Sequence, residues 1–450
     1  MSDVHDPSQI PIELLDAIMD HTDEETQTSC SLVCRHWSPT ARRHRFREVI
    51  ILPHREEAQP RSASLLCDPT STILPYICRL NISLEGLTPE KDGAVYTSNV
   101  PWQEAALGLW PTRGLWFDAV LPMMRMHDLT ALKTLYISDL SWERLSLESR
   151  RGLAILCQRV ISLKLSFSGK VPAMPCSSLA NLLIAATSLQ DLSIHYSCNV
   201  PPTKSRPNPL TPPDAQKPAL TSLRSLRLTF QPAHFHTYLP GPPFQSLQLR
   251  ELSLGTITHN AHVDLVLPFL RSCAATLERL YLKFECLSSP WQAYYPMRKA
   301  HFSAQGGLSG LSSLRSLHLD VDDLQTLPAI LRQIDSPKLV DLTLTATPTT
   351  LEHTELGDLA DSLSTGRLAR TRISVICVSA RPWWNASGAI SESARDYMYD
   401  VLNAGLMDLR AEGRLHVSCL DRVPEIVHEV HIQEDDYWDE DEDEDEDENI

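Results

Sequence analysis

Nine six-residue segments with the pattern apolar-x-x-Leu-x-apolar limit the folds that this chain of 450 residues can adopt. After one long first gap, they begin 25 to 37 residues apart. The last four residues of each segment alternate apolar and polar side chains, as a strand with one buried face does. We refer to these segments as hexads. They are Ile77–Ile82, Leu132–Ile137, Val160–Leu165, Leu189–Ile194, Leu223–Leu228, Leu249–Leu254, Leu277–Leu282, Leu314–Leu319 and Leu339–Leu344.

Between hexads lie segments with apolar residues at three- and four-residue spacing, which is typical of amphipathic helices. A strand and a helix repeated at this period cannot bury their apolar faces alone, so the repeats must stack. The sequence therefore predicts an α/β solenoid, a horseshoe with parallel strands on the concave side and helices on the convex side. Examples of the predicted helices are Ser178–Ala186, Val263–Ala274, Leu324–Ile334 and Glu355–Leu363.

The hexads resemble leucine-rich repeats. No asparagine recurs after them at the position where that family often carries Asn or Cys, so the repeats are expected to be irregular. We predict a further strand at Arg372–Val378, a helix at Ala394–Ala404 and a last edge strand at Val427–Ile432.

A separate pattern occupies residues 10–49, where three short helices are expected. Pro11 stands directly before an apolar run of helical spacing, and proline is favoured in a first helical turn. A second apolar cluster and a basic run, Arg42–Arg47, follow. Forty residues bury too little apolar surface to be stable alone.

IPIELLDAIM, SLVCRHW and RRHRFREV together resemble an F-box, in the form common among fungal F-box proteins. The resemblance implies binding to a Skp-family adaptor and, through it, to a cullin–RING ubiquitin ligase. The simpler alternative is an amphipathic helical cap on the solenoid. The residues that would form or support the adaptor-binding face are Pro11, Leu14, Leu15, Ile18, Leu32, Val33, Cys34 and Trp37.

We accordingly expect five regions along the chain. They are an F-box at 1–52, a linker at 53–72, an irregular leucine-rich repeat solenoid at 73–369, a C-terminal repeat or cap at 370–433, and an acidic tail at 434–450. The tail is expected to be disordered, because its like charges repel and nothing apolar offsets the entropy of ordering.

The net charge of −17 is concentrated in that tail. Thirteen acids lie between Glu434 and Glu448, which leaves −4 to the other residues. The body therefore lacks the broad basic field that recruits nucleic acid. Neither a signal peptide nor an apolar run of about 18 residues is present, so we expect no membrane span and a cytoplasmic or nuclear location.

The sequence contains no motif that predicts catalysis, a cofactor or a metal. His428-Glu429-Val430-His431 differs from HExxH and lacks a third ligand at a recognised spacing. No glycine-rich phosphate loop and no nucleophile elbow are found. The eleven cysteines form no C-x-x-C pair and fit buried positions in a reducing compartment. We expect a protein that is not an enzyme.

The leading hypothesis is a substrate-recognition subunit of an SCF-type E3 ubiquitin ligase, whose solenoid binds a target protein. The alternative is a non-catalytic scaffold, or an acidic-tailed interaction protein, without a role in ubiquitylation. The third and fifth hexad positions should face the concave side together. In the central repeats these positions hold the residues predicted to bind the target, Arg227, Glu251, Arg279 and Tyr281, because Arg and Tyr are enriched at binding hot spots.

Overall fold

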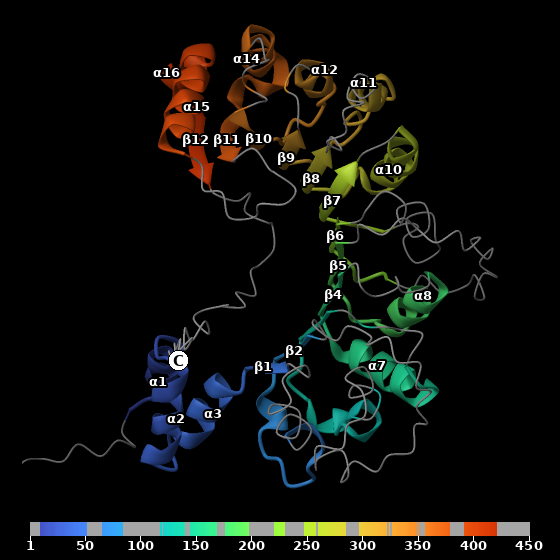
Figure 1. Cartoon of the computed structure of the whole chain (residues 1–450), viewed down its shortest axis with the longest axis vertical. Helices are drawn as coiled ribbons and strands as arrows, with labels where there is room; N and C mark the ends of the chain where they lie inside the picture. The colour runs from blue at the N-terminus through green and yellow to red at the C-terminus, as the bar shows by residue number, and fades with distance from the viewer. Residues whose placement is uncertain are drawn as a thin grey trace, which may run out of the picture.

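The structure is a computed structural model. It describes residues 10–51, 65–83, 118, 120–138, 140, 145–168, 176–197, 220–229, 247–257, 260–284, 297–321, 324, 326–348, 351, 356–378 and 391–420. Three short helices precede a long, curved parallel sheet with helices on its outer side (Figure 1). The acidic tail at 434–450 and the predicted strand Val427–Ile432 lie outside the described residues.

The first three helices are α1 (Ile12–Asp20), α2 (Glu24–Val33) and α3 (Ser38–Arg45). Pro11 occupies the N-cap of α1 and the Asp23 side chain caps α2 by accepting from the Thr26 amide. Their core is small, with only Leu15, Met19 and Ala41 among the described apolar residues buried in it. The three helices therefore leave apolar surface exposed, as the sequence predicts.

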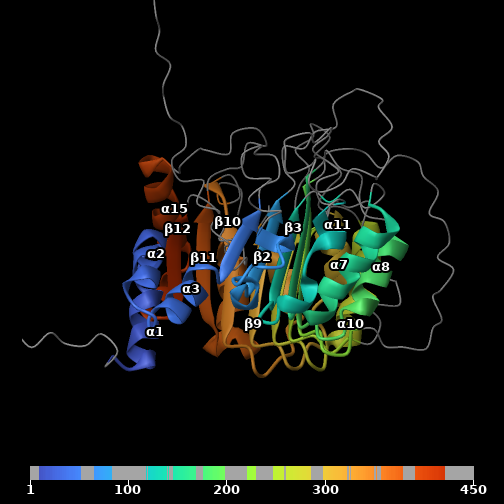
Figure 2. The same ribbon diagram turned by 90° about the horizontal axis from the view of Figure 1, so that it is seen from below.

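The sheet has 12 strands, each parallel to its neighbours and placed in the order of the sequence. Its strands line the inner side of the curve, while the helices lie outside it (Figures 1 and 2). The strands are β1 (Glu48–Ile51), β2 (Arg79–Ser83), β3 (Thr134–Ser138), β4 (Ser162–Ser168), β5 (Asp191–Ser197), β6 (Ser225–Thr229), β7 (Glu251–Ile257), β8 (Arg279–Phe284), β9 (Ser316–Val321), β10 (Asp341–Ala346), β11 (Arg372–Val378) and β12 (Leu415–Leu420).

The hexads account for strands β2 to β10, and each strand begins at the third residue of its hexad. All three apolar positions of every hexad are buried. Full burial of a leucine or isoleucine side chain contributes about 1.5–3 kcal/mol, so the repeated pattern fixes which face of each strand points inward. The predicted α/β solenoid architecture is confirmed.

The outer helices match the predicted ones closely. Four of them, α8, α10, α12 and α14, lie at the ranges given above, with α12 shorter than expected. α7 and α11 also lie between hexads, at ranges that were not specified. The helices and single turns after α3 are η2 (Leu74–Tyr76), η4 (Leu121–Met123), η5 (Met126–Asp128), α7 (Leu147–Arg159), α8 (Cys176–Ala185), α10 (Asn260–Cys273), α11 (Met297–Ala304), α12 (Leu327–Leu331), α14 (Leu356–Ser364), η9 (Gly366–Arg370), α15 (Glu392–Gly405) and α16 (Met407–Ala411).

The sheet continues beyond the hexads at both ends. β11 was predicted, and α15 covers the helix predicted at 394–404. β1 and β12 were not predicted. β1 has only four residues. β12 has six residues whose side chains alternate apolar and polar as far as Cys419, but none of them is fully buried. β1 directly follows α3 and pairs with β2, which joins the three helices to the sheet.

A single apolar core runs under the sheet from Ile51 to Leu409. It includes Leu66, which lies within the segment predicted as a linker but is buried. No helix in the described part of the chain combines the length and apolar character needed to cross a membrane.

Candidate functional site

α1 and α2 expose apolar side chains that no described residue covers. Leu14 and Ile18 are one helical turn apart on α1 and expose 58% and 45% of their surface. Leu32 and Val33 are the last residues of α2 and are also exposed, by 82% and 57% of their surface. Large exposed apolar groups gathered on so small a unit mark a surface for a partner.

The other residues predicted at this surface have different surroundings. Pro11 is exposed at the start of α1, and Cys34, which ends α2, is partly exposed. Leu15 is completely buried, and Trp37 is half-buried against the core that Leu15 forms. Leu15 and Trp37 therefore support the exposed face from within. Ile12 is also exposed, and the sequence reasoning missed it although it belongs to the same apolar run.

A polar side chain fastens α1 to α2. The Gln27 amide nitrogen donates to the carbonyl oxygens of Met19 at 3.1 Å and Thr22 at 3.0 Å. The Met19 carbonyl belongs to the last turn of α1, where backbone acceptors lack a full set of partners within the helix, and Thr22 lies in the turn that follows. Gln27 therefore stabilises the junction between α1 and α2 by hydrogen bonding.

Ion pairs fasten α3 to α1. His44 Nε2 lies 2.7 Å from Asp16 Oδ1, and Nδ1 of the same ring lies 3.2 Å from Asp20. Arg43 also pairs with Asp16. The hydrogen bond from His44 is the largest cause that lowers the pKa of Asp16 below its usual value, and Arg43 adds to it. Most of the basic run is therefore engaged within the three helices, because Arg45 pairs with Glu24 and Arg47 with Asp20.

The third hexad positions form a continuous row across the sheet, which we call the inner row. In the strand register, Asp191 faces Ser225, which faces Glu251, then Arg279, Ser316 and Asp341. Arg279 forms an ion pair with Glu251, and Ser225 donates to Glu251 at 3.3 Å. The register thus brings the predicted target-binding residues Glu251 and Arg279 together, but they compensate each other's charge.

Arg227 and Tyr281 occupy the fifth-position row, with Ser253 between them. Burial is the largest cause that lowers the pKa of Arg227; nearby Arg279 lowers it too, while Asp191 raises it. The Tyr281 hydroxyl donates to Asp320 at 3.1 Å. The four predicted residues therefore lie on three neighbouring strands, β6 to β8.

His318 on β9 continues this row, next to Tyr281 in the strand register. The ring of Tyr281 packs edge-on against His318, with 4.7 Å between the ring centres. His318 lies 2.8 Å from the Thr345 hydroxyl, and its burial lowers its pKa to about 4.

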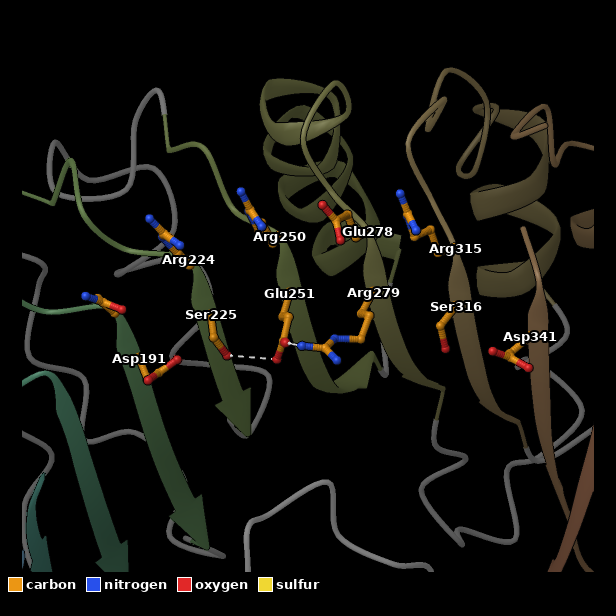
Figure 3. Close-up of a pocket in the computed structure, with 11 residues that line it drawn as sticks. Asp191, Arg224, Ser225, Arg250, Glu251, Glu278, Arg279, Arg315, Ser316 and Asp341 are labelled. Carbon is orange, nitrogen blue, oxygen red and sulfur yellow. Dashed lines mark hydrogen bonds and ion pairs between the residues drawn. The ribbon is translucent and has the colours of Figure 1, made fainter. Parts of the chain in front are cut away.

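A groove of about 450 Å³ runs along the starts of strands β5 to β10 (Figure 3). The inner row forms one side of it. The other side carries residues at the second hexad position, Arg224, Arg250, Glu278 and Arg315, which the sequence reasoning missed. One sequence feature could have identified them: arginine recurs directly after the first apolar residue of several hexads.

Within the described part of the chain, no three His, Cys, Asp or Glu side chains lie close enough together to hold a metal ion. Buried cysteines are unreactive in this structure. Burial raises the pKa of Cys157 to about 12 and that of Cys273 to about 11, which disfavours the nucleophilic thiolate.

Comparison with known proteins gives a match over the three helices α1, α2 and α3. No curated protein matches the chain. The family model described as the F-box domain matches residues 7–48, a range that contains α1, α2 and α3 together with their exposed apolar residues. The chain therefore carries an F-box domain, followed by an open sheet of 12 parallel strands that is consistent with a leucine-rich-repeat-like solenoid.

Proposed function

We propose that this protein is the substrate-recognition subunit of an SCF-type ubiquitin ligase. In this proposal the F-box binds a Skp-family adaptor, and through it a cullin–RING ligase, while the concave side of the sheet binds a target protein. Proteins with an F-box generally act as adaptors without catalytic activity of their own. Action in such a complex implies a cytoplasmic or nuclear location.

The observation that carries the proposal is the match of residues 7–48 to the F-box domain, combined with the exposed apolar side chains on those helices. Leu14, Ile18 and Leu32 would lose their contact with water on binding an adaptor. Such burial is favourable by about 25 cal/mol for each Å² of apolar surface. Pro11, Val33 and Cys34 would extend this face, whereas Leu15 and Trp37 would hold its shape.

For the target we propose the central concave patch of Arg227, Glu251, Arg279 and Tyr281. Tyr281 offers a large side chain held in place by His318 and Asp320, so it loses little freedom on binding. Arg227 is partly desolvated, which strengthens its interaction with an acidic partner group. Binding a target here would raise the effective concentration of its lysines near the ubiquitin-conjugating enzyme.

Adaptor binding can be tested with the full chain by measuring its affinity for a Skp-family adaptor. Ile18→Asp should weaken binding more than tenfold, because it places a charge in an apolar interface. Leu147→Asp is the matched control, since Leu147 is also an exposed aliphatic residue, 57% accessible against 45% for Ile18, but lies on α7. Equal affinity of the Ile18→Asp variant and the unchanged chain would refute the F-box function.

The target patch needs a separate test. The proteins bound by the full chain are compared with those bound by the triple variant Arg227→Ala, Arg279→Ala and Tyr281→Ala. The control variant is Arg79→Ala. Arg79 lies on β2 and pairs with Glu48 on the neighbouring strand, as Arg279 pairs with Glu251. Loss of specific partners with adaptor binding intact supports the patch. A rise in the abundance of those partners when the F-box is deleted would distinguish a ligase subunit from a scaffold.

A further inference from the structure

The groove at the strand starts carries three arginines to which the described residues offer no acidic partner. Arg224, Arg250 and Arg315, at the starts of β6, β7 and β9, are exposed, and we call them the outer arginine row. Among the described residues, no carboxylate lies within ion-pair distance of any of the three. Figure 3 shows their side chains pointing to the same side of the groove, away from the inner row.

The backbone fixes the spacing of this row. The Arg250 amide donates to the Arg224 carbonyl, the Glu278 amide to the Arg250 carbonyl, and the Arg315 amide to the Glu278 carbonyl, each at 2.8 Å. Neighbouring strands are about 4.8 Å apart, so the row presents three guanidinium groups over roughly 14 Å of sheet edge.

The acids lining the groove do not neutralise this row. Glu251 is paired with Arg279, and Asp341 accepts a hydrogen bond from Arg372 at 2.7 Å. Asp191 acts electrostatically on Arg227. Of the acids that line the groove, only Glu278 lies at the same hexad position as the three arginines of the outer arginine row. One negative charge there cannot balance three positive ones.

The same chain contains a segment of complementary charge. From Asp439 to Glu448 every residue is acidic, so any register of an extended segment would place carboxylates opposite the arginines. The basic run of the F-box is a poorer match, because Arg43, Arg45 and Arg47 already pair with acids of α1 and α2.

The length of the chain allows the contact. β12 ends at Leu420, and the 14 residues from there to Glu434 span up to about 46 Å when extended. Across the sheet, β12 and β6 are six strand spacings apart, which is about 29 Å. Along the strands, the distance from the end of β12 to the strand starts is the length of a six-residue strand, about 20 Å. The straight distance from Leu420 to the start of β6 is therefore about 35 Å, which is shorter than the extended segment.

We propose that the outer arginine row binds the chain's own acidic segment, residues 434–448. The contact is intramolecular and electrostatic, and it covers the groove beside the inner row. Exposed ion pairs are individually weak, so several must act together, and the tether helps by giving the segment an effective concentration of about millimolar. This inference does not depend on the proposed ligase function.

The test uses the full chain with the photoreactive residue p-benzoylphenylalanine in place of Tyr437 or, separately, Trp438. After irradiation, crosslinked peptides are identified by mass spectrometry, and gel mobility separates crosslinks within one molecule from those between two. We expect intramolecular crosslinks to the starts of β6, β7 and β9. Their yield should fall as salt is raised, because screening shortens to about 3 Å at 1 M ionic strength.

The triple variant Arg224→Glu, Arg250→Glu and Arg315→Glu should reduce the crosslinks about tenfold. The matched control, Arg151→Glu, Arg332→Glu and Arg410→Glu, reverses three exposed arginines associated with outer helices α7, α12 and α16 and should leave them unchanged. Thermal unfolding checks both variants for folding, and Arg→Gln substitutions in the outer arginine row should give a smaller loss.

Three results would overturn the inference. Crosslinks to other surfaces, or none to the row, would show that the segment does not lie there. Crosslinks only between molecules would assign the row to a second copy. A yield that is insensitive to the charge reversal would exclude electrostatic recognition. Adaptor affinity measured on the same variants should be unchanged, so failure of this inference would be distinct from failure of the proposed function.

Discussion

Leu14 and Leu15 are consecutive in α1, yet 58% of Leu14 is exposed while Leu15 is completely buried. Successive residues of a helix point about 100° apart, so one faces outward and the other reaches the core formed with Met19 and Ala41. The two residues therefore have different roles in the F-box, although the sequence predicts both at one surface.

The first prediction separates these roles. Leu14→Ala should weaken adaptor binding about tenfold or more and leave the folding of the F-box intact. Leu15→Ala should instead destabilise the F-box by about 2–5 kcal/mol, because it leaves a cavity in a core of only a few residues. Calorimetric titration with the adaptor and hydrogen exchange of α1 measure the two effects. Similar exchange in both variants would contradict the assignment.

The second prediction concerns Gln27. Gln27→Ala removes two hydrogen bonds to the end of α1 and should destabilise the contact of α1 with α2 by about 1–2 kcal/mol. The measurement is amide hydrogen exchange of residues 12–33 in the full chain. Thr28→Ala is the control, because the Thr28 hydroxyl donates only within its own helix, to Glu24. Faster exchange in the control than in Gln27→Ala would count against this role.

The third prediction is a pH dependence from His318. Its pKa is lowered to about 4 in the folded chain, against 6.5 for the ordinary side chain, so the unfolded chain binds the proton more strongly. The neutral imidazole therefore contributes stability that is fully present above about pH 6.5 and is lost as pH falls toward 4. The contribution is at most about 3 kcal/mol.

This can be measured by urea unfolding of the full chain at pH 7.5 and pH 5. The loss of stability between the two values should be smaller in His318→Gln, which keeps a polar group near the Thr345 hydroxyl. Equal losses in the variant and the unchanged chain would show that His318 does not titrate as described.

The fourth prediction concerns the close approach of Gly307 to Phe302. A Cβ at Gly307 would overlap the Phe302 ring, which is fully buried and packs edge-on against Phe284 with 5.3 Å between ring centres. Gly307→Ala should destabilise the sheet region by about 1–3 kcal/mol, as overpacking does.

Gly357→Ala is the matched control for that substitution. Gly357 lies in α14, and nothing stands within 4 Å of its added Cβ. Alanine should therefore raise stability by up to about 1 kcal/mol through its higher helix propensity. Thermal unfolding reports both changes, and a stabilised Gly307→Ala variant would disprove the overlap.

The sequence by itself determined the architecture, because the hexads repeat a pattern of buried positions that only stacked parallel strands satisfy. Leu226 and Leu228, for instance, point inward, so Arg227 between them must face the concave side. The F-box residues were recognisable for a similar reason, since helical spacing and local motifs lie within forty residues of sequence.

Only the tertiary structure decided how the polar residues are paired. Glu251 and Arg279 are 28 residues apart, and strand register rather than spacing joins them. The other arginines of the groove, Arg224, Arg250 and Arg315, have no acidic partner in the part of the chain that the structure describes. β1 and β12 became visible only as neighbours of β2 and β11, because backbone hydrogen bonds to an existing strand stabilise segments that bury few or none of their own side chains fully. Burial is periodic along a chain and can be predicted from it, whereas a charge pair depends on which distant strands become neighbours.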